Sequence, residues 1–228
     1  MQVSLEDFFF TAFKRHGGLF IAGTDTGIGK TYVACSLARS LKAQGLSVGV
    51  FKAAETGLSP AQARQRSGAS DAARLLAASG AKDSLALVRP FHFKRPLAPY
   101  AAAILEGRTF SLGKALACFK ALQGRHDGIL AEGAGGLLVP YGPDLDGAGL
   151  AKALGLPLVV VARPGLGTVN HTLLTLEAAR RRGLKVHCVV VNGLKGRGGE
   201  AEAVSPAMIA KFGKVAVFGP LPWRAKPA

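Results

Sequence analysis

Acidic residues are scarce in this chain of 228 residues, which has 14 Asp and Glu against 29 Lys and Arg and a formal net charge of +15. Such an excess of positive charge suits either a nucleic-acid partner or a site for anionic ligands. The basic residues are scattered apart from residues 180–182, and aromatic residues do not alternate with them as in a single-strand-binding groove. We therefore do not expect direct nucleic-acid binding. Because carboxylates are so few, Asp25, Asp71 and Glu132 stand out at strand ends and in glycine-rich loops.

Cysteines and long apolar segments are also scarce. Cys35, Cys118 and Cys188 lie far apart among apolar neighbours, which excludes both a metal-ligand spacing and an even disulfide framework. No segment approaches the roughly 18 unbroken apolar residues of a membrane helix. Glu6 and Asp7 stand where a signal peptide would carry basic residues. We expect a cytoplasmic protein with no membrane partner.

Short apolar segments alternate with longer segments of helical character. The apolar segments are residues 19–22, 48–51, 128–131, 158–161, 186–191 and 215–218. This alternation predicts an α/β fold with a mostly parallel sheet flanked by helices. The segments are apolar at nearly every position, as expected when helices cover both faces of the sheet. We expect residues 1–228 to form a single domain, with residues 1–16 as an N-terminal extension that packs as a short helix.

A glycine-rich loop follows the first predicted strand and precedes a predicted helix at residues 32–43. It contains Gly23, Gly27 and Gly29 and ends in Lys30-Thr31. Strand, glycine loop and helix in this order predict a P-loop NTPase fold, in which backbone N–H groups and the helix N-terminus bind phosphate. Lys30 is expected to reach the β- and γ-phosphates of ATP, and Thr31 to ligate Mg²⁺. The alternative is a turn that joins a strand to a helix and binds nothing.

The loop departs from the strict P-loop pattern, because Thr24 stands where the first glycine belongs. Some ATPases that act in DNA partitioning carry a second lysine in this loop, at the position of Asp25 or Thr26. Neither residue is lysine here. This absence argues against the alternative function, a partition- or switch-type P-loop ATPase that binds DNA or a protein partner.

The loop Gly23-Thr24-Asp25-Thr26 followed by Gly29-Lys30-Thr31 resembles the opening of the dethiobiotin synthetase family. Further segments resemble this family in the same order, and they are residues 51–57, 70–72, 96–102, 132–136, 166–171, 191–192 and 219–223. Glu132-Gly133-Ala134-Gly135-Gly136 and Leu166-Gly167-Thr168-Val169-Asn170-His171 are the most diagnostic. The resemblance extends from residue 19 to residue 223.

The resemblance implies an ATP- and Mg²⁺-dependent ligase that forms C–N bonds in biotin biosynthesis. Its substrates would be 7,8-diaminononanoate, CO₂ or bicarbonate, and ATP, and it would form dethiobiotin through a carbamate and a carbamic-phosphoric anhydride. Such an enzyme must hold two anions and neutralise charge that moves between them, which suits lysines and Mg²⁺. Lys30 and Lys52 are therefore the expected catalytic residues. A homodimer is also implied.

The resemblance assigns binding roles to many residues. The implied ATP contacts are Asp25, Gly27, Ile28, Gly29, Lys30, Thr31, Tyr32, Asp71, Glu132, Gly133, Ala134, Gly135, Asn192, Gly193, Pro222, Trp223 and Arg224. The implied substrate contacts are Thr26, Lys52, Thr56, Gly167, Thr168, Val169 and Asn170, of which residues 167–170 would receive a carboxylate across a dimer interface. The implied metal ligands are Thr31, Asp71 and Glu132, whose hard oxygen atoms suit Mg²⁺.

Four of these assignments have simpler alternatives. Lys52 could be an exposed lysine at a strand end, and Asp71 with Ser70 could cap a helix over residues 72–78. Residues 167–170 could form an ordinary turn capped by Thr168. Asn192 could be a turn residue, although its amide also suits an adenine edge.

Overall fold

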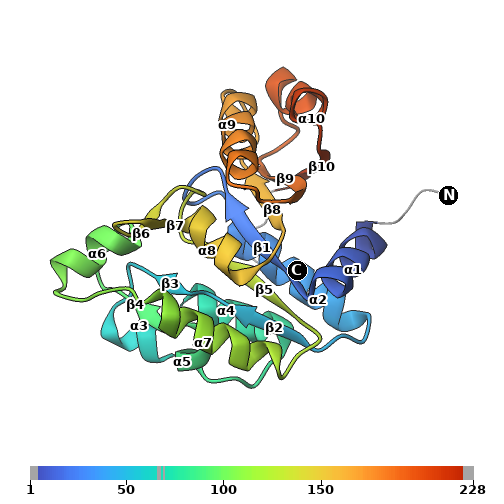
Figure 1. The fold of residues 1–228 in the computed structure, drawn as a ribbon. Helices are drawn as coiled ribbons and strands as arrows, with labels where there is room; N and C mark the ends of the chain where they lie inside the picture. Colours follow the sequence, from blue (N-terminus) through green and yellow to red (C-terminus); the bar gives the residue numbers. More distant parts are fainter. Residues whose placement is uncertain (1–4, 66–67, 69, 223–228) are drawn as a thin grey trace.

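A six-stranded sheet forms the centre of the protein, whose computed structural model describes residues 5–65, 68 and 70–222 (Figure 1). The strands lie in the order β10-β9-β8-β1-β5-β2, and every neighbouring pair is parallel. They are β1 (Gly18–Gly23), β2 (Val48–Phe51), β5 (Gly128–Glu132), β8 (Leu158–Ala162), β9 (Val186–Leu194) and β10 (Ala216–Pro222). Each of the six apolar segments forms one of these strands, so the prediction of a parallel α/β sheet is confirmed.

The sheet is built outward in both directions from β1. The chain first crosses from β1 to β2 and later adds β8, β9 and β10 on the opposite side. Because such crossovers are right-handed, their helices cover both faces. The principal crossover helices are α2 (Lys30–Ala43), α4 (Asp71–Ser79), α7 (Leu112–Gln123), α8 (Gly147–Leu154), α9 (Thr168–Arg181) and α10 (Glu200–Gly213). Ligands of open α/β sheets bind beyond the carboxyl ends of the strands, at the point where the strand order reverses. In this sheet that point lies beside β1.

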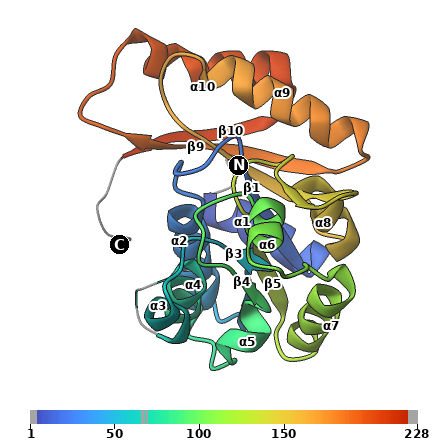
Figure 2. The same ribbon diagram turned by 90° about the vertical axis from the view of Figure 1, so that its left-hand side faces the viewer.

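The helices form two groups in space. α2 packs beside α4, and both contact β2. α9 and α10 pack together over the β8, β9 and β10 side of the sheet (Figure 2). No helix among the described residues is long and apolar enough to cross a membrane.

The N-terminal helix α1 (Leu5–His16) packs on the sheet, as predicted. Phe13 is fully buried, and the ring of Phe8 stacks on His187 of β9 with ring centroids 4.2 Å apart. Phe8 also meets Phe218 of β10 edge-on at 5.0 Å. The helix thereby shields strands of the sheet that lie far from it in sequence.

Several short elements were not predicted. They are α3 (Pro60–Arg64), α5 (Leu85–Val88), the parallel pair β3 (Ala54–Glu55) and β4 (Phe91–His92), and the antiparallel pair β6 (Pro140–Gly142) and β7 (Leu145–Asp146), whereas α6 (Pro99–Leu105) begins within residues 96–102, where a helix start was expected. Elements this short carry little periodicity from which they could be recognised. The β3–β4 pair matters for the site because it positions Glu55.

Candidate active site

The phosphate loop lies between β1 and α2, at the carboxyl edge of the sheet. Helix α2 begins at Lys30, two residues earlier than predicted, with Gly29 as its N-cap at φ 90°. No described side chain caps this N-terminus, so the first N–H groups of the helix are available to a ligand. A left-handed backbone at this position favours glycine. The geometry is therefore that of an anion-binding loop.

Lys30 is buried in the first turn of α2. Its ammonium donates a hydrogen bond to the carbonyl of Asp25 at 2.9 Å, within the same loop. Burial, and then the neighbouring ammonium of Lys52, lower the pKa of Lys30 to about 8. A phosphate beside Lys30 would favour its charged form.

Asn192 ties β9 to the phosphate loop. Its amide Nδ2 donates a hydrogen bond to the carbonyl of Ile28 at 3.0 Å. The side chain is buried, and its Oδ1 atom has no hydrogen-bond partner among the described residues. Gly29 passes so close that a Cβ there would lie 2.1 Å from Asn192 Nδ2. Asn192 is thus part of the loop's support and leaves one buried acceptor atom unused.

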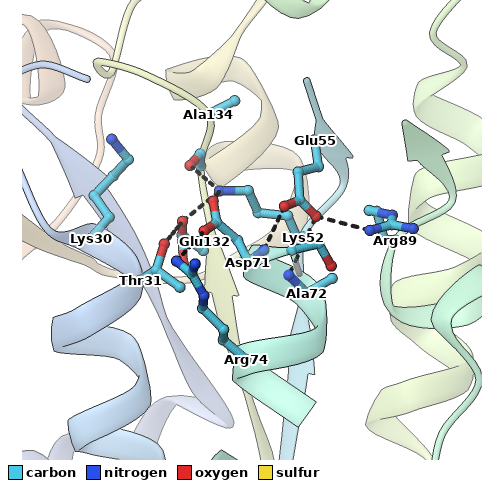
Figure 3. A network of polar contacts seen from close by, with 12 residues as sticks. Lys30, Thr31, Lys52, Glu55, Asp71, Ala72, Arg74, Arg89, Glu132 and Ala134 are labelled. Atoms are coloured by element: carbon cyan, nitrogen blue, oxygen red, sulfur yellow. Dashed lines mark hydrogen bonds and ion pairs between the residues drawn. The ribbon is translucent and has the colours of Figure 1, made fainter. Parts of the chain in front are cut away.

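A cluster of charged and polar side chains lies beside the phosphate loop (Figure 3). Lys52, which follows β2, forms an ion pair with Glu132 at the end of β5 and a second with Asp71 Oδ2 at 3.1 Å. Its ammonium also donates to the carbonyl of Gly133 at 3.3 Å. Thr31 Oγ1 donates to Glu132 Oε1 at 3.0 Å. Lys52 is therefore buried and contacts Asp71, Glu132 and Gly133, and it is not an exposed lysine at a strand end.

The carboxylates keep Lys52 charged. Burial alone would lower the pKa of Lys52, but Glu132 and Asp71 outweigh burial and raise it above its ordinary value. Burial likewise acts to raise the pKa of Asp71, but Lys52 outweighs it and holds that pKa below its ordinary value. Burial, which outweighs the attraction of Lys52, raises the pKa of Glu132 above its ordinary value. The ammonium of Lys52 therefore lies between Asp71, whose charged form is favoured, and Glu132, whose charged form burial disfavours.

The oxygen atoms of this cluster fit a divalent cation. Thr31, Asp71 and Glu132, the implied metal ligands, converge here, and Glu132 Oε2 is buried with no hydrogen-bond partner in the described part of the chain. The described residues contain no group of three or more His, Cys, Asp and Glu side chains that could hold a metal. A cation here would rely on two carboxylates, a hydroxyl and water, which is an arrangement that suits Mg²⁺ and not Zn²⁺.

Asp71 is oriented by Ser70, an expected cap, and by Glu55, which was not among the predicted site residues. Ser70 caps α4 by accepting from the N–H of Ala73 at 3.2 Å, so Asp71 is not the capping residue. Glu55 accepts from the N–H groups of Asp71 at 2.5 Å and Ala72 at 3.3 Å. Only the presence of a carboxylate in the segment 51–57 could have pointed to Glu55.

Glu55 is itself held by Arg89. Arg89 Nη1 lies 3.1 Å from Glu55 Oε2, and both side chains are buried. Arg89 also donates to the carbonyl of Ala63 at 2.5 Å. The pair therefore fixes the N-terminus of α4, and with it the aspartate that faces Lys52.

A cleft of about 890 Å³ joins the phosphate loop to this cluster. Many of the expected ATP contacts line it, namely Gly27, Gly29, Lys30, Thr31, Tyr32, Asp71, Glu132, Ala134, Gly135, Asn192 and Gly193. The expected substrate contacts that line it are Thr26, Lys52 and Thr56. Segments from β1, β2, β5 and β9 thus converge on one cavity.

The other expected contacts do not line this cleft in the described part of the chain. They are Asp25, Ile28, Gly133, Pro222, Gly167, Thr168, Val169 and Asn170. Trp223 and Arg224 lie outside the described residues. The alternative of a turn capped by Thr168 is wrong, because Gly167 is the N-cap of α9 and Thr168 is its first residue. The Thr168 side chain is buried inside the helix start and cannot cap it.

Further residues that were not predicted line the cleft. Arg39 on α2, and Arg74 on α4, face it beside Cys35. The signal for Arg74 was its spacing of three from Asp71, and the signal for Arg39 was its spacing of eight from Thr31, since both spacings return to the same helix face.

Comparison with known proteins finds close relatives over most of the chain. Residues 17–227 match a family model described as an AAA domain. The ATP-dependent dethiobiotin synthetase of Bacillus licheniformis is 46% identical over 205 residues, which cover 90% of this chain and 85% of that protein. The same enzyme from an Anaeromyxobacter species is 47% identical over 206 residues, 90% of each chain. The Bacillus subtilis enzyme is 38% identical, covering 90% of this chain and 87% of its own.

Solved structures with a similar fold have much lower sequence identity. The MinC:MinD cell division complex of Aquifex aeolicus matches with a TM-score of 0.52 at 14% identity, covering 92% of this chain and 82% of that chain. A ParA family ATPase from Chlorobium tepidum matches with a TM-score of 0.54 at 13% identity, covering 92% and 86%. These structures establish the fold alone, and the prediction of a P-loop NTPase fold is confirmed.

Proposed function

The chain belongs to the family of ATP-dependent dethiobiotin synthetases, and we propose that its cleft joins 7,8-diaminononanoate and CO₂ into dethiobiotin with ATP as phosphoryl donor. This makes it a ligase of biotin biosynthesis that forms C–N bonds. The observation that carries the proposal is the position of Lys52, whose ammonium lies between Asp71 and Glu132 in the cleft that the phosphate loop lines.

The proposed reaction has three steps. One amine of the substrate attacks CO₂ and loses a proton, which gives a carbamate. A carbamate oxygen attacks the γ-phosphorus of ATP, ADP leaves, and a carbamic-phosphoric anhydride forms. The second amine attacks the carbonyl carbon and loses a proton, and the carbon–oxygen bond to phosphate breaks as the cyclic urea closes. For these three steps the protein must position the reactants and neutralise the negative charge that moves between them.

Lys30 and Lys52 supply the positive charges for these steps. Lys30 lies at the start of α2, where helix N–H groups and its own ammonium can hold the β- and γ-phosphates. Lys52 is a compact point charge on a flexible stem, so it can exchange a carboxylate partner for a carbamate or phosphoryl oxygen. Thr31, Asp71 and Glu132 would hold Mg²⁺, which neutralises the phosphate charge when bound.

Asn192 is the proposed contact to the adenine base. Its unused Oδ1 atom is an acceptor that matches the exocyclic amino group of adenine. Gly193 lines the cleft beside it. ATP is therefore favoured over a nucleotide with a carbonyl at that position.

The diamine is proposed to lie near Thr26 and Thr56, which line the same cleft as Lys52. Its carboxylate tail would be bound by the start of α9 in a second copy of the chain, in a homodimer. Support comes from two observations. Residues 167–170 do not line the cleft of the same described chain, and Leu166 beside them is 90% exposed. The cytoplasmic location stays a prediction.

The test is an assay of the purified protein with ATP, Mg²⁺, bicarbonate and 7,8-diaminononanoate. Dethiobiotin and inorganic phosphate are expected to form in equal amounts, and omission of the diamine should remove phosphate release. ATP hydrolysis that ignores the diamine but responds to DNA would contradict the proposal and favour a partition-type ATPase.

A further inference from the structure

One end of the cleft lies between α2 and α4 and is lined by arginines. Three residues of α2 and three of α4 line this end, namely Thr31, Cys35 and Arg39, and Asp71, Arg74 and Ala77. Intervals of four and three residues place each set along one helix face. We call the part formed by Cys35, Arg39, Arg74 and Ala77 the arginine branch. The arginine branch adjoins Thr31 and Asp71, the predicted metal ligands at the N-terminal ends of the same two helices.

Arg74 is held so that part of its guanidinium remains available. Its Nε donates to the carbonyl of Gly68 at 3.1 Å, which fixes the planar group. Its Nη1 is 3.8 Å from Asp71 Oδ1, beyond hydrogen-bond distance. The side chain is 54% exposed and extends from α4 toward Thr31 and Asp71 (Figure 3). Arg74 can therefore donate to a ligand in the cleft without breaking its contact with Gly68.

Arg39 presents the second cationic group. Its Nη1 atom is buried and has no hydrogen-bond partner within the part of the chain that the structure describes. A buried donor without a partner costs free energy, and a charged donor costs more. The neighbouring thiol of Cys35 supplies no negative charge, since burial, and then Glu132, raise its pKa to about 12. Arg39 Nη1 is thus a buried donor that lacks an acceptor among the described residues.

The chemistry of this end of the cleft suits a tetrahedral oxyanion. Guanidinium groups bind phosphate through paired N–H donors, and two of them line this cleft, which Asp71, Glu55 and Glu132 also line. In the proposed function, the phosphates of the nucleotide are bound by the phosphate loop and Lys30. The oxyanion that remains is the inorganic phosphate released as the urea ring closes.

We propose that the arginine branch binds inorganic phosphate, the product of the reaction, at a subsite outside the phosphate loop. This inference rests on the proposed function, because it names one of that reaction's products. The subsite lets phosphate leave the phosphate loop along the α2–α4 end while ADP is still bound.

The experiment titrates inorganic phosphate into the full-length protein saturated with ADP and Mg²⁺ and follows the heat of binding. One phosphate site is expected in the unmodified protein. Arg74→Ala should weaken phosphate binding at least tenfold, and Arg39→Ala with Arg74→Ala more so, whereas ADP affinity should change less than twofold. Arg15→Ala is the matched control, because it removes the same charge from the exposed end of α1 and should leave phosphate binding unchanged.

Three results would overturn the proposal. The ADP-bound protein could fail to bind phosphate, or Arg74→Ala could bind it within twofold of the unmodified protein. Equal losses of ADP and phosphate affinity would mean that the arginines serve the nucleotide. Because Arg74 is largely exposed, its single variant tests the proposal even if the Arg39 variant does not fold. Dethiobiotin is not measured here, so a failure of the ligase assay is distinguishable from a failure of this test.

Discussion

The side chain of Asn192 donates its hydrogen bond to the carbonyl of Ile28 at 3.0 Å, which joins the end of β9 to the phosphate loop. The two residues are far apart in sequence, and their contact passes directly beside Gly29. The conformation of the loop therefore depends on β9, a strand far from the loop in sequence.

Gly29→Ala should disable the loop more severely than Gly27→Ala. Both glycines have left-handed backbones, at φ 90° and 73°, so alanine at either costs about 1–2 kcal/mol of strain. A Cβ at position 29 would also collide with Asn192, whereas no described atom lies within 4 Å of one at position 27. We expect ATP affinity to fall at least tenfold more for the first variant, as measured by calorimetry. Equal losses would show that the contact with Asn192 is dispensable.

Lys52→Ala should lower the rate of dethiobiotin formation by about two to three orders of magnitude while largely preserving ATP binding. The ammonium lies between Glu132 and Asp71 and not in the phosphate loop. Loss of one such charge typically costs about 10²–10³-fold in turnover. Product formation and ATP binding are measured separately, with Lys82→Ala, at an exposed position, as the control. Turnover within tenfold of that of the unmodified protein would exclude the proposed role of Lys52.

Glu55→Gln should destabilise the protein strongly, because it leaves Arg89 buried without its charged partner. Breaking a buried ion pair from one side costs about 3–5 kcal/mol in the free energy of unfolding. Denaturant unfolding measures this loss, and Glu177→Gln, which breaks an exposed pair with Arg181, should cost less than ~1 kcal/mol. The double variant Glu55→Gln with Arg89→Met should lose less than the sum of the single variants. Additive losses would mean that the pair is not coupled.

Asp83→Asn should lower stability in a pH-dependent way. Asp83 is buried, with His126 Nε2 at 2.7 Å and Arg125 Nη1 at 3.0 Å. Burial alone would raise the pKa of Asp83, but hydrogen bonds from His126 and Arg125 outweigh it and lower that pKa. The unfolded chain then binds more protons in the acid range, so this stabilisation is present above the ordinary aspartate pKa of about 3.9 and is lost as pH falls through the lower folded value.

The measurement is the free energy of unfolding in urea at a series of pH values. The difference between the unmodified protein and Asp83→Asn should be largest near neutral pH and should narrow toward and below about pH 4. Asp144→Asn, at an exposed position, is the control. A difference that does not change with pH would show that Asp83 acts only through packing.

The sequence alone predicted the sheet and the phosphate loop because both are local signals. Six apolar segments, each bounded by helical stretches, became the six strands. Glycines before Lys30-Thr31 placed the loop between a strand and a helix, since only glycine adopts its left-handed backbone freely. The family resemblance added Lys52, Asp71 and Glu132, which then converged in the structure.

Only the tertiary structure determined which distant side chains contact or adjoin those residues. Glu55 and Arg89 are 34 positions apart, and nothing in either local sequence indicates that they form a buried pair. Whether Asp71 faces Lys52 or caps its helix depended on packing, because Ser70 beside it is an equally good cap. Arg39 and Arg74 line the same cleft only because α2 and α4 pack together. Composition and periodicity fix which segments are strands and helices, but contacts between distant side chains depend on how those segments pack.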